Sequence, residues 1–328
     1  MSDPDKKETY PGIYLATTDA GLPDWFTNDF KKYGNFSELA GGGNGVLMAC
    51  TDGNLGRKVA IKTLRKDREN SPRDRRRLLR EARITAQLTH PNTVPVYEIG
   101  KTDEGEIYFA MKKVEGDSLY KILVSMARGD EPAIKEFTLE RLLEILVLAG
   151  NALAYAHRRG VIHRDIKPEN ILVGLYDEVY LMDWGVAKVW GMPNESREDE
   201  VTQTELQDRL TGTGRRPGTP LYMSPEQVRD LPVDERTDIF SMGVMLYEIL
   251  ALKEPFRGRT INETFDNILH EEPPPPSTVS KHFTVPTPLD AICHRAMQKK
   301  PADRYQSMLE MIRAIRQFRE KAILPNGD

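Results

Sequence analysis

Cysteine is scarce in this sequence of 328 residues. Its two cysteines, Cys50 and Cys293, lie far apart and match no zinc-ligand spacing, which favours reduced thiols in a cytosolic protein. Long apolar runs are also missing. The most apolar segments, Leu142–Ala156 and Ile239–Leu252, are shorter or more interrupted than the about 20 residues of a membrane-spanning helix. The opening MSDPDKKETY lacks the apolar stretch of a secretory signal, so no membrane segment is expected in the chain as given.

The sequence has no excess of positive charge either. There are 46 Lys and Arg residues against 50 Asp and Glu residues, a formal net charge of −4. This balance argues against a general nucleic-acid binder, which usually carries a basic excess. No internal repeat is visible at periods of about 20 to 50 residues. Hydrophobic residues make up 39% of the chain and charged residues 29%, which is ordinary for a globular protein with a substantial core.

The first third of the chain is rich in predicted strands. Residues 33–62 hold short β-favouring runs with a glycine turn between them, and further strands are predicted at 94–99 and 107–114. Ser71, followed by a proline, predicts the N-cap of a helix that reaches about Leu88. The residues before position 33 are polar and turn-rich, which is typical of an extension.

The remainder is rich in predicted helices. From Thr138, leucine and alanine recur at helical spacing until Gly160. Residues 191–218 show no period and predict a mobile loop. Together the two regions predict an α+β protein with two lobes that divide near Glu115–Ser118, and a cleft between lobes commonly binds a ligand. Further helices are predicted at 234–252, 260–271, 286–298 and 304–320.

The strongest functional motif is HRDIKPEN at residues 163–170. Phosphoryl transfer needs positioning, charge neutralisation and an acceptor for the hydroxyl proton. Asp165 can accept the hydrogen of a substrate hydroxyl, Lys167 can balance charge near the γ-phosphate, and Asn170 can ligate a metal. A lone loop aspartate is usually a turn residue, but a match of this length indicates the catalytic loop of a protein kinase.

On this motif the chain resembles the bacterial eukaryotic-like (Hanks-type) serine/threonine protein kinases, over roughly residues 33–320. Lysine at 167 is typical of the serine/threonine members. The resemblance implies transfer of the γ-phosphoryl group of ATP to Ser or Thr hydroxyls of proteins, with Mg²⁺ or Mn²⁺ as metal. It also implies the bilobal protein kinase fold, with a small β-rich N-lobe that has one main helix and a larger helical C-lobe. The expected boundaries are an N-terminal extension at 1–32, the N-lobe at 33–114, the C-lobe at 115–320 and a C-terminal tail at 321–328.

Three further positions match the catalytic machinery of the family. Asp183, in Asp-Trp-Gly where the family has Asp-Phe-Gly, offers a hard oxygen ligand to the metal, as does Asn170. Lys62 ends a Val-Ala-Ile-Lys strand and resembles the lysine that holds the α- and β-phosphates. Glu81 resembles the helix glutamate that positions this lysine. Taken alone, Lys62 could be a solvent-facing strand end and Glu81 a surface partner of a neighbouring arginine.

The glycine-rich run before Lys62 resembles the loop that covers the phosphates, because glycines let backbone N–H groups approach them without a Cβ in the way. Ala40 stands where the family has its first glycine, and Leu47 stands where the family has a valine. By itself the run could be a flexible turn. The resemblance implies that Asp117 contacts the ribose of ATP. Asp117 could equally be a solvated loop residue. The implied ATP-binding residues are Leu39, Ala40, Gly41, Gly42, Gly43, Asn44, Gly45, Leu47, Ala60, Lys62, Met111, Lys112, Val114, Asp117 and Leu172.

Downstream, Gly-Thr-Pro at 218–220 and Ser-Pro-Glu at 224–226 resemble the substrate-facing loop and its closing motif. Thr219 matches the family threonine that bonds the catalytic aspartate and lysine. The resemblance also predicts a buried pair between Glu226 and Arg304. Asp238 is expected to brace the backbone of the catalytic loop.

Thr211 and Thr213 are the candidate phosphorylation sites, because bacterial members commonly carry a Thr-x-Thr pair in this loop. A phosphate there would meet Arg164, with Lys188 and Arg77 completing a basic pocket. A transient homodimer is one route to such autophosphorylation in trans. The alternative interpretation is that both threonines are turn residues among glycines.

Two other function classes stay open at this point. A pseudokinase scaffold is favoured only by alanine at position 40, Trp184 and the long activation segment. A small-molecule kinase would share the lysine and aspartate chemistry but would not need the peptide-binding segment. The expected location is the cytoplasm, either as a separate protein or as the cytosolic domain of a longer membrane-anchored one.

Overall fold

The structure is a computed structural model that describes residues 27–41, 45–189 and 220–323. Its elements fall into two units. The first holds the chain up to Glu69 together with Tyr97–Lys113, and the second holds Asn70–Val96 and the chain from Val114 onward. The break predicted near Glu115–Ser118 therefore lies within a few residues of a unit boundary.

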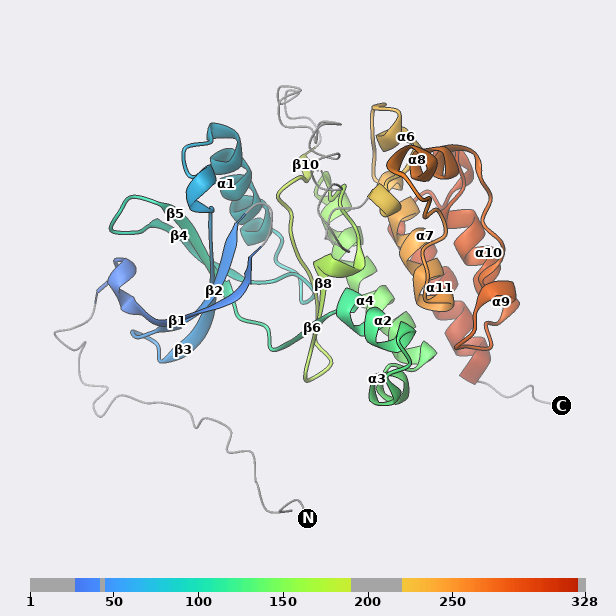
Figure 1. Ribbon diagram of the computed structural model, residues 1–328, viewed down its shortest axis with the longest axis horizontal. Helices are drawn as coiled ribbons and strands as arrows, with labels where there is room; N and C mark the ends of the chain where they lie inside the picture. Colours follow the sequence, from blue (N-terminus) through green and yellow to red (C-terminus); the bar gives the residue numbers. More distant parts are fainter. Residues whose placement is uncertain (1–26, 42–44, 190–219, 324–328) are drawn as a thin grey trace, which may run out of the picture. The chain divides into compact units, whose positions relative to one another are not determined.

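The first unit is built on a five-stranded sheet in the order β1-β2-β3-β5-β4, drawn in blue to green in Figure 1. Its core holds Tyr33, Val59, Ile61 and Tyr108, which are at most 6% exposed. Phe30, in the one-turn helix η1, packs against this core. The bounds are η1 Phe30–Lys32, β1 Tyr33–Gly41, β2 Val46–Asp52, β3 Arg57–Thr63, η2 Lys66–Arg68, β4 Val96–Lys101 and β5 Ile107–Lys112.

Helix α1 runs from Pro72 to Gln87, as the serine–proline signal predicts. The hydroxyl of Ser71 accepts the backbone N–H of Asp74 at 3.2 Å, which caps the helix. The resemblance places this helix in the N-lobe, whereas its contacts group it with the second unit. Ile84 and Leu88 are 8% and 3% exposed and belong to the large core of that unit, which accounts for this grouping.

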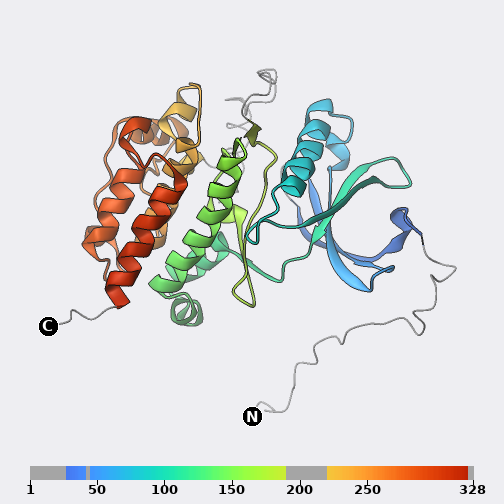
Figure 2. The same ribbon diagram turned by 180° about the vertical axis from the view of Figure 1, so that it is seen from behind.

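The second unit is mainly helical. Every residue of α7 from Thr237 to Ala251 is buried, so this helix forms the centre of the core. Helix α4 packs against α11, and α7 packs against α10, as Figures 1 and 2 show. In the described part of the chain no helix is long and apolar enough to cross a membrane. The bounds are α2 Leu119–Ala127, α3 Glu131–Glu136, α4 Leu139–Arg158, α6 Pro225–Val228, α7 Arg236–Ala251, α8 Ile261–His270, α9 Pro276–Val279, α10 Thr287–Ala296 and α11 Met308–Ile323.

Two small sheets hold the functional loops of this unit, in the orders β6-β8-β9 and β10-β7. Short 3₁₀ turns η3, η5 and η6 connect the helices and strands. The bounds are β6 Gly116–Ser118, β7 Val161–Ile162, η3 Pro168–Asn170, β8 Ile171–Gly174, β9 Val179–Leu181, β10 Lys188–Val189, η5 Pro220–Tyr222 and η6 Pro301–Asp303.

The predicted helices agree with the structure except at one start, and four helices of the structure were not predicted. Thr138 caps α4, and Gly160 follows its end at a φ of 74°. The start predicted at residue 304 was wrong, because α11 begins at Met308. Arg304 lies in an irregular segment where its guanidinium donates to the carbonyls of Gln298 and Lys299, at 2.7 and 3.0 Å. Helices α2, α3, α6 and α9 were not predicted.

Both cysteines are free, as the sequence indicates, and the structure shows that both are buried. Burial raises the pKa of the Cys50 thiol to about 11, with the nearby Asp52 charge adding to the shift. Burial also raises the pKa of Cys293 well above its usual range. Neither thiol has the thiolate character that reactive cysteines need.

Candidate active site

The loop between β7 and η3 carries the catalytic motif and is held by a buried aspartate from α7. Asp238 Oδ2 accepts the backbone N–H of His163, and its Oδ1 accepts that of Arg164, each at 2.8 Å. His157 Nε2 lies 2.8 Å from Oδ2. Burial opposes ionisation, but these bonds and the neighbouring histidines outweigh it and lower the pKa of Asp238. The predicted brace is confirmed, and it fixes Arg164 at a φ of 68°.

Asp165 and Lys167 meet in the same loop. Lys167 Nζ donates to Asp165 Oδ2 at 2.5 Å, and only 8% of the lysine is exposed. Burial alone would lower the lysine pKa, but the charge and hydrogen bond of Asp165, with the charges of Asp183 and Glu169, raise it overall. The ammonium group therefore stays protonated.

Asn170 and Asp183 supply the oxygens of the candidate metal site. Asn170 Nδ2 donates to the carbonyl oxygen of Asp165 at 2.7 Å and to its Oδ2 at 3.3 Å. This orientation turns the amide oxygen of Asn170 to the other side, where a cation can use it. The backbone N–H of Met182 donates to the Asn170 carbonyl at 2.8 Å, which places Asp183 beside the loop. A carboxylate and an amide oxygen are hard ligands that suit Mg²⁺, so the residues fit this ion.

Glu81 reaches the Asp-Trp-Gly segment from α1. A Cβ added at Gly185 would lie 3.2 Å from Asp183 Oδ1 and 3.4 Å from Glu81 Oε2, so glycine lets both carboxylates approach this backbone. Glu81 is 8% exposed, so it is not a surface residue, and its role in positioning Lys62 stays a prediction.

Trp184 fills an apolar slot, as the resemblance implies for an aromatic residue there. Its side chain is fully buried, and its ring centroid lies 4.5 Å from that of His163. His163 in turn donates from Nε2 to the Met182 carbonyl at 2.9 Å. Trp184 thus packs the metal-site segment against the catalytic loop.

The first unit carries Lys62 and the glycine-rich run. Lys62 lies on β3, paired with Leu47 of β2 and Phe109 of β5. A Cβ at Gly45 would overlap the carbonyl oxygen of Thr63. Glycine is therefore required at position 45 by the close approach of β2 and β3, a reason that the motif alone did not supply.

The other ATP-binding candidates divide between the units. In the first unit Ala60 pairs with Met111, both at most 4% exposed, and Lys112 follows on β5. Leu39 lies on β1 with 45% of its surface exposed, and Ala40 and Gly41 end that strand. In the second unit lie Val114, Asp117 and Leu172. Gly42, Gly43 and Asn44 lie outside the described residues, as do Thr211, Thr213 and Thr219.

Asp117 makes an ion pair with Lys121, at 3.1 Å between Oδ1 and Nζ. The two side chains are 59% and 71% exposed, so the pair contributes little to stability. The strand β6 nevertheless places Asp117 beside Val173 and Ser118 beside Leu172 of β8. The sugar-binding assignment of Asp117 stays a prediction.

Sequence reasoning missed Gln227. Its Nε2 donates to the carbonyl of Arg164 at 2.9 Å, so it gives the loop a second support besides Asp238. The available signal was the capping box of α6, where Ser224 and Gln227 bond one another's backbone. That signal predicts a helix start, but not the second contact of the glutamine.

The predicted pair of Glu226 and Arg304 is confirmed. The guanidinium donates to both carboxylate oxygens, at 2.7 and 2.8 Å, with Arg304 only 1% exposed. Burial opposes ionisation of Glu226, but the bonds from Arg304 lower its pKa overall.

Arg304→Ala is expected to lower the free energy of unfolding by about 3–5 kcal/mol, because it leaves the Glu226 charge buried without its partner. Chemical denaturation measures this. The matched control is Arg65→Ala, which breaks an exposed pair with Asp67 (3.0 Å) and should change stability by about 0–1 kcal/mol. Equal losses in the two variants would contradict the role of the buried pair.

The fold and these contacts define a protein kinase domain, and the comparisons agree. The chain belongs to the protein kinase family, because the model described as "Protein kinase domain" matches residues 33–315. It is 36% identical over 309 residues to the serine/threonine-protein kinase PknD of Protochlamydia amoebophila, covering 92% of this chain and 31% of that protein. It is 35% identical over 288 residues to PknD of Chlamydia pneumoniae, covering 86% of this chain and 30% of that protein. The chain thus spans about a third of the length of these relatives. The resemblance to Hanks-type kinases and the bilobal fold class are confirmed.

Proposed function

We propose that this chain is the catalytic domain of a serine/threonine protein kinase that transfers the γ-phosphoryl group of ATP to protein hydroxyls. The observation that carries the proposal is the arrangement of Lys167 on Asp165 beside Asn170 and Asp183. Three elements of phosphoryl transfer meet there: a proton acceptor, a fixed positive charge and hard oxygen ligands.

The roles in this proposal combine these contacts with the family resemblance. Asp165 orients the substrate hydroxyl and accepts its proton as the oxygen bonds to the γ-phosphorus and ADP leaves. Lys167, held protonated by Asp165 and Asp183, balances charge on the transferred group. Asn170 and Asp183 would hold Mg²⁺ or Mn²⁺, which neutralises charge on the phosphates when bound. Lys62 is assigned to the α- and β-phosphates, Glu81 to its positioning, and Thr219 to the choice of Ser or Thr acceptors. The boundaries at 33–114 and 115–320 remain proposals.

The proposal is tested by incubating the protein with γ-labelled ATP, Mg²⁺ and a generic basic protein. A kinase of this class labels serine and threonine in the added protein. Absence of label despite ATP binding would support a pseudokinase scaffold. Label that appears only in small hydroxyl compounds would support a small-molecule kinase.

We further propose autophosphorylation on Thr211 or Thr213, with Arg164 and Arg77 receiving the phosphate. Both arginines line one pocket of the second unit. Lys188, predicted as a third member, is not among its lining residues, whereas Val189 is. A cytoplasmic location, within a longer protein, and a transient homodimer for reaction in trans belong to the same proposal.

After incubation with ATP, phosphate is expected on Thr211 or Thr213, since charge-assisted bonds to phosphate are about twice as strong as neutral ones. The double alanine variant should be at least about tenfold slower, because one to three such bonds would order the loop. Mass spectrometry and initial rates measure the two effects. Full activity in the double variant would contradict the assignment.

A further inference from the structure

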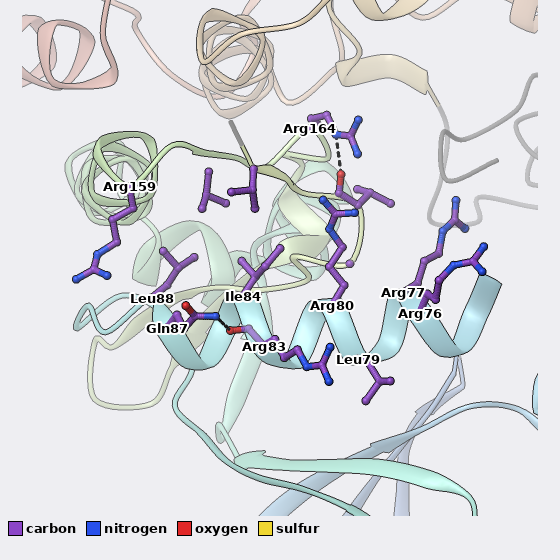
Figure 3. Close-up of a pocket in the computed structure, with 14 residues that line it drawn as sticks. Arg76, Arg77, Leu79, Arg80, Arg83, Ile84, Gln87, Leu88, Arg159 and Arg164 are labelled. Atoms are coloured by element: carbon purple, nitrogen blue, oxygen red, sulfur yellow. Dashed lines mark hydrogen bonds between the residues drawn. The ribbon is translucent and has the colours of Figure 1, made fainter. Parts of the chain in front are cut away.

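A basic pocket of 510 Å³ lies in the second unit (Figure 3). It is lined by α1, the end of α4, β7 and the segment that follows Trp184. Fourteen residues line it, and none of them is Asp or Glu. Six are arginines, namely Arg76, Arg77, Arg80, Arg83, Arg159 and Arg164.

The arginines do not form a single cluster. Figure 3 shows Arg159 at one end of the pocket and Arg76 and Arg77 toward the other, with Ile84 and Leu88 between them. The rest of the apolar lining comes from Leu79, Val161, Val186 and Val189. The pocket therefore offers two cationic ends separated by an apolar middle.

Two of the six arginines have no carboxylate partner among the residues that the structure describes. In the part of the chain that the structure describes, neither Arg83 nor Arg159 forms an ion pair with a carboxylate; Arg159 instead lies over the ring of Tyr155 at 4.9 Å. A helix C-terminus attracts cations only within its last turn. The last turn of α1 contains no basic residue, so its arginines are not placed there by the helix dipole.

We propose that this arginine pocket is a docking site for an acidic, amphipathic segment of a partner protein. The occupant would carry Asp, Glu or phosphorylated residues on both sides of an apolar residue. Guanidinium groups match carboxylates and phosphates with two parallel hydrogen bonds, and the apolar middle requires a partner that can cover it. The single phosphate assigned above to Arg164 and Arg77 would occupy one end and leave Arg83 and Arg159 without an anion.

The site also adjoins the catalytic residues. Gly185 lines the pocket, and its backbone is the one that Asp183 and Glu81 approach. An occupant would touch this backbone and the helix that carries Glu81. Phosphoryl transfer itself does not require the outer arginines, so this inference goes beyond the proposed function.

The test is fluorescence anisotropy on the full chain with a labelled peptide, Glu-Glu-Ala-Leu-Leu-Ala-Glu-Glu, at physiological ionic strength. The pocket variants are Arg83→Glu and Arg159→Glu. Their matched controls are Arg75→Glu and Arg158→Glu, which change exposed arginines on the same two helices that do not line the pocket. Circular dichroism checks that each variant is folded.

Each pocket variant is expected to weaken binding at least about tenfold, because glutamate replaces an attractive charge pair by a repulsion between like charges, and each control less than about twofold. A peptide with serine in place of both leucines should also bind more weakly. Absence of binding, or equal losses in pocket and control variants, would overturn the proposal. If the serine peptide or inorganic tripolyphosphate bound as tightly as the leucine peptide, the pocket would be a general polyanion site, and the proposal of an amphipathic occupant would be wrong. Binding is measured without turnover, so the outcome is independent of kinase activity.

Discussion

Asp165→Asn is expected to fold and to bind ATP but to lose transfer by about 10²–10⁴-fold, the range for general acid–base assistance. The carboxylate is the group that accepts the substrate hydroxyl's hydrogen bond. The amide has nearly the same shape, but it cannot accept the proton and weakens the bond that Lys167 Nζ donates to Oδ2. The rate of peptide phosphorylation at saturating ATP measures the loss.

The matched control is Asp177→Asn. Asp177 is an exposed aspartate in the turn between β8 and β9, paired with Arg141 at 2.8 Å and 81% exposed. Its φ of 63° suits asparagine as well as aspartate. Activity in this control should stay close to that of the unchanged protein. More than a tenth of the original activity in Asp165→Asn would exclude the assigned role.

Asp183→Ala is expected to lower Mg²⁺-dependent turnover by at least about 10³-fold. Metal ions contribute several kcal/mol of charge stabilisation in such reactions, and about 1.36 kcal/mol corresponds to a factor of ten. Turnover measured against Mg²⁺ and Mn²⁺ concentration reports the effect. Recovery of the original rate at high metal concentration would show that Asp183 is not an essential ligand.

The stability of the same variant without nucleotide separates the metal role from a structural one. Asp183 adopts a φ of 60°, a left-handed conformation that costs alanine about 1–2 kcal/mol. Asp230→Ala is the matched control, because Asp230 has a φ of 54° and lies in an exposed turn. The two variants should lower the melting temperature by similar amounts. A much larger loss for Asp183→Ala would identify the carboxylate as a structural group.

Features that depend on residues close together in the chain could be predicted from the sequence. The cap at Ser71 and the helical period from Thr138 predict α1 and α4 because capping and periodicity act within a few residues. The catalytic loop and the Asp-Trp-Gly segment were predicted for the same reason, since each is a short motif with a fixed spacing. The family resemblance also predicted two contacts between distant residues. These are the pair of Glu226 with Arg304 and the contact of Asp238 with the backbone of the catalytic loop.

Contacts between segments that are far apart in the chain and belong to no known motif could be seen only in the tertiary structure. Gln227 reaches the Arg164 carbonyl across 63 positions of sequence, and Arg304 interrupts the predicted helix because backbone carbonyls and Glu226 fix its guanidinium. From the sequence, the arginines of α1 could be interpreted as a solvated helix face. The structure shows that several of them line one pocket together with Arg159 and Gly185. The physical reason is that a buried polar group must find a hydrogen-bond partner wherever the packed core supplies one, and local sequence does not specify that place.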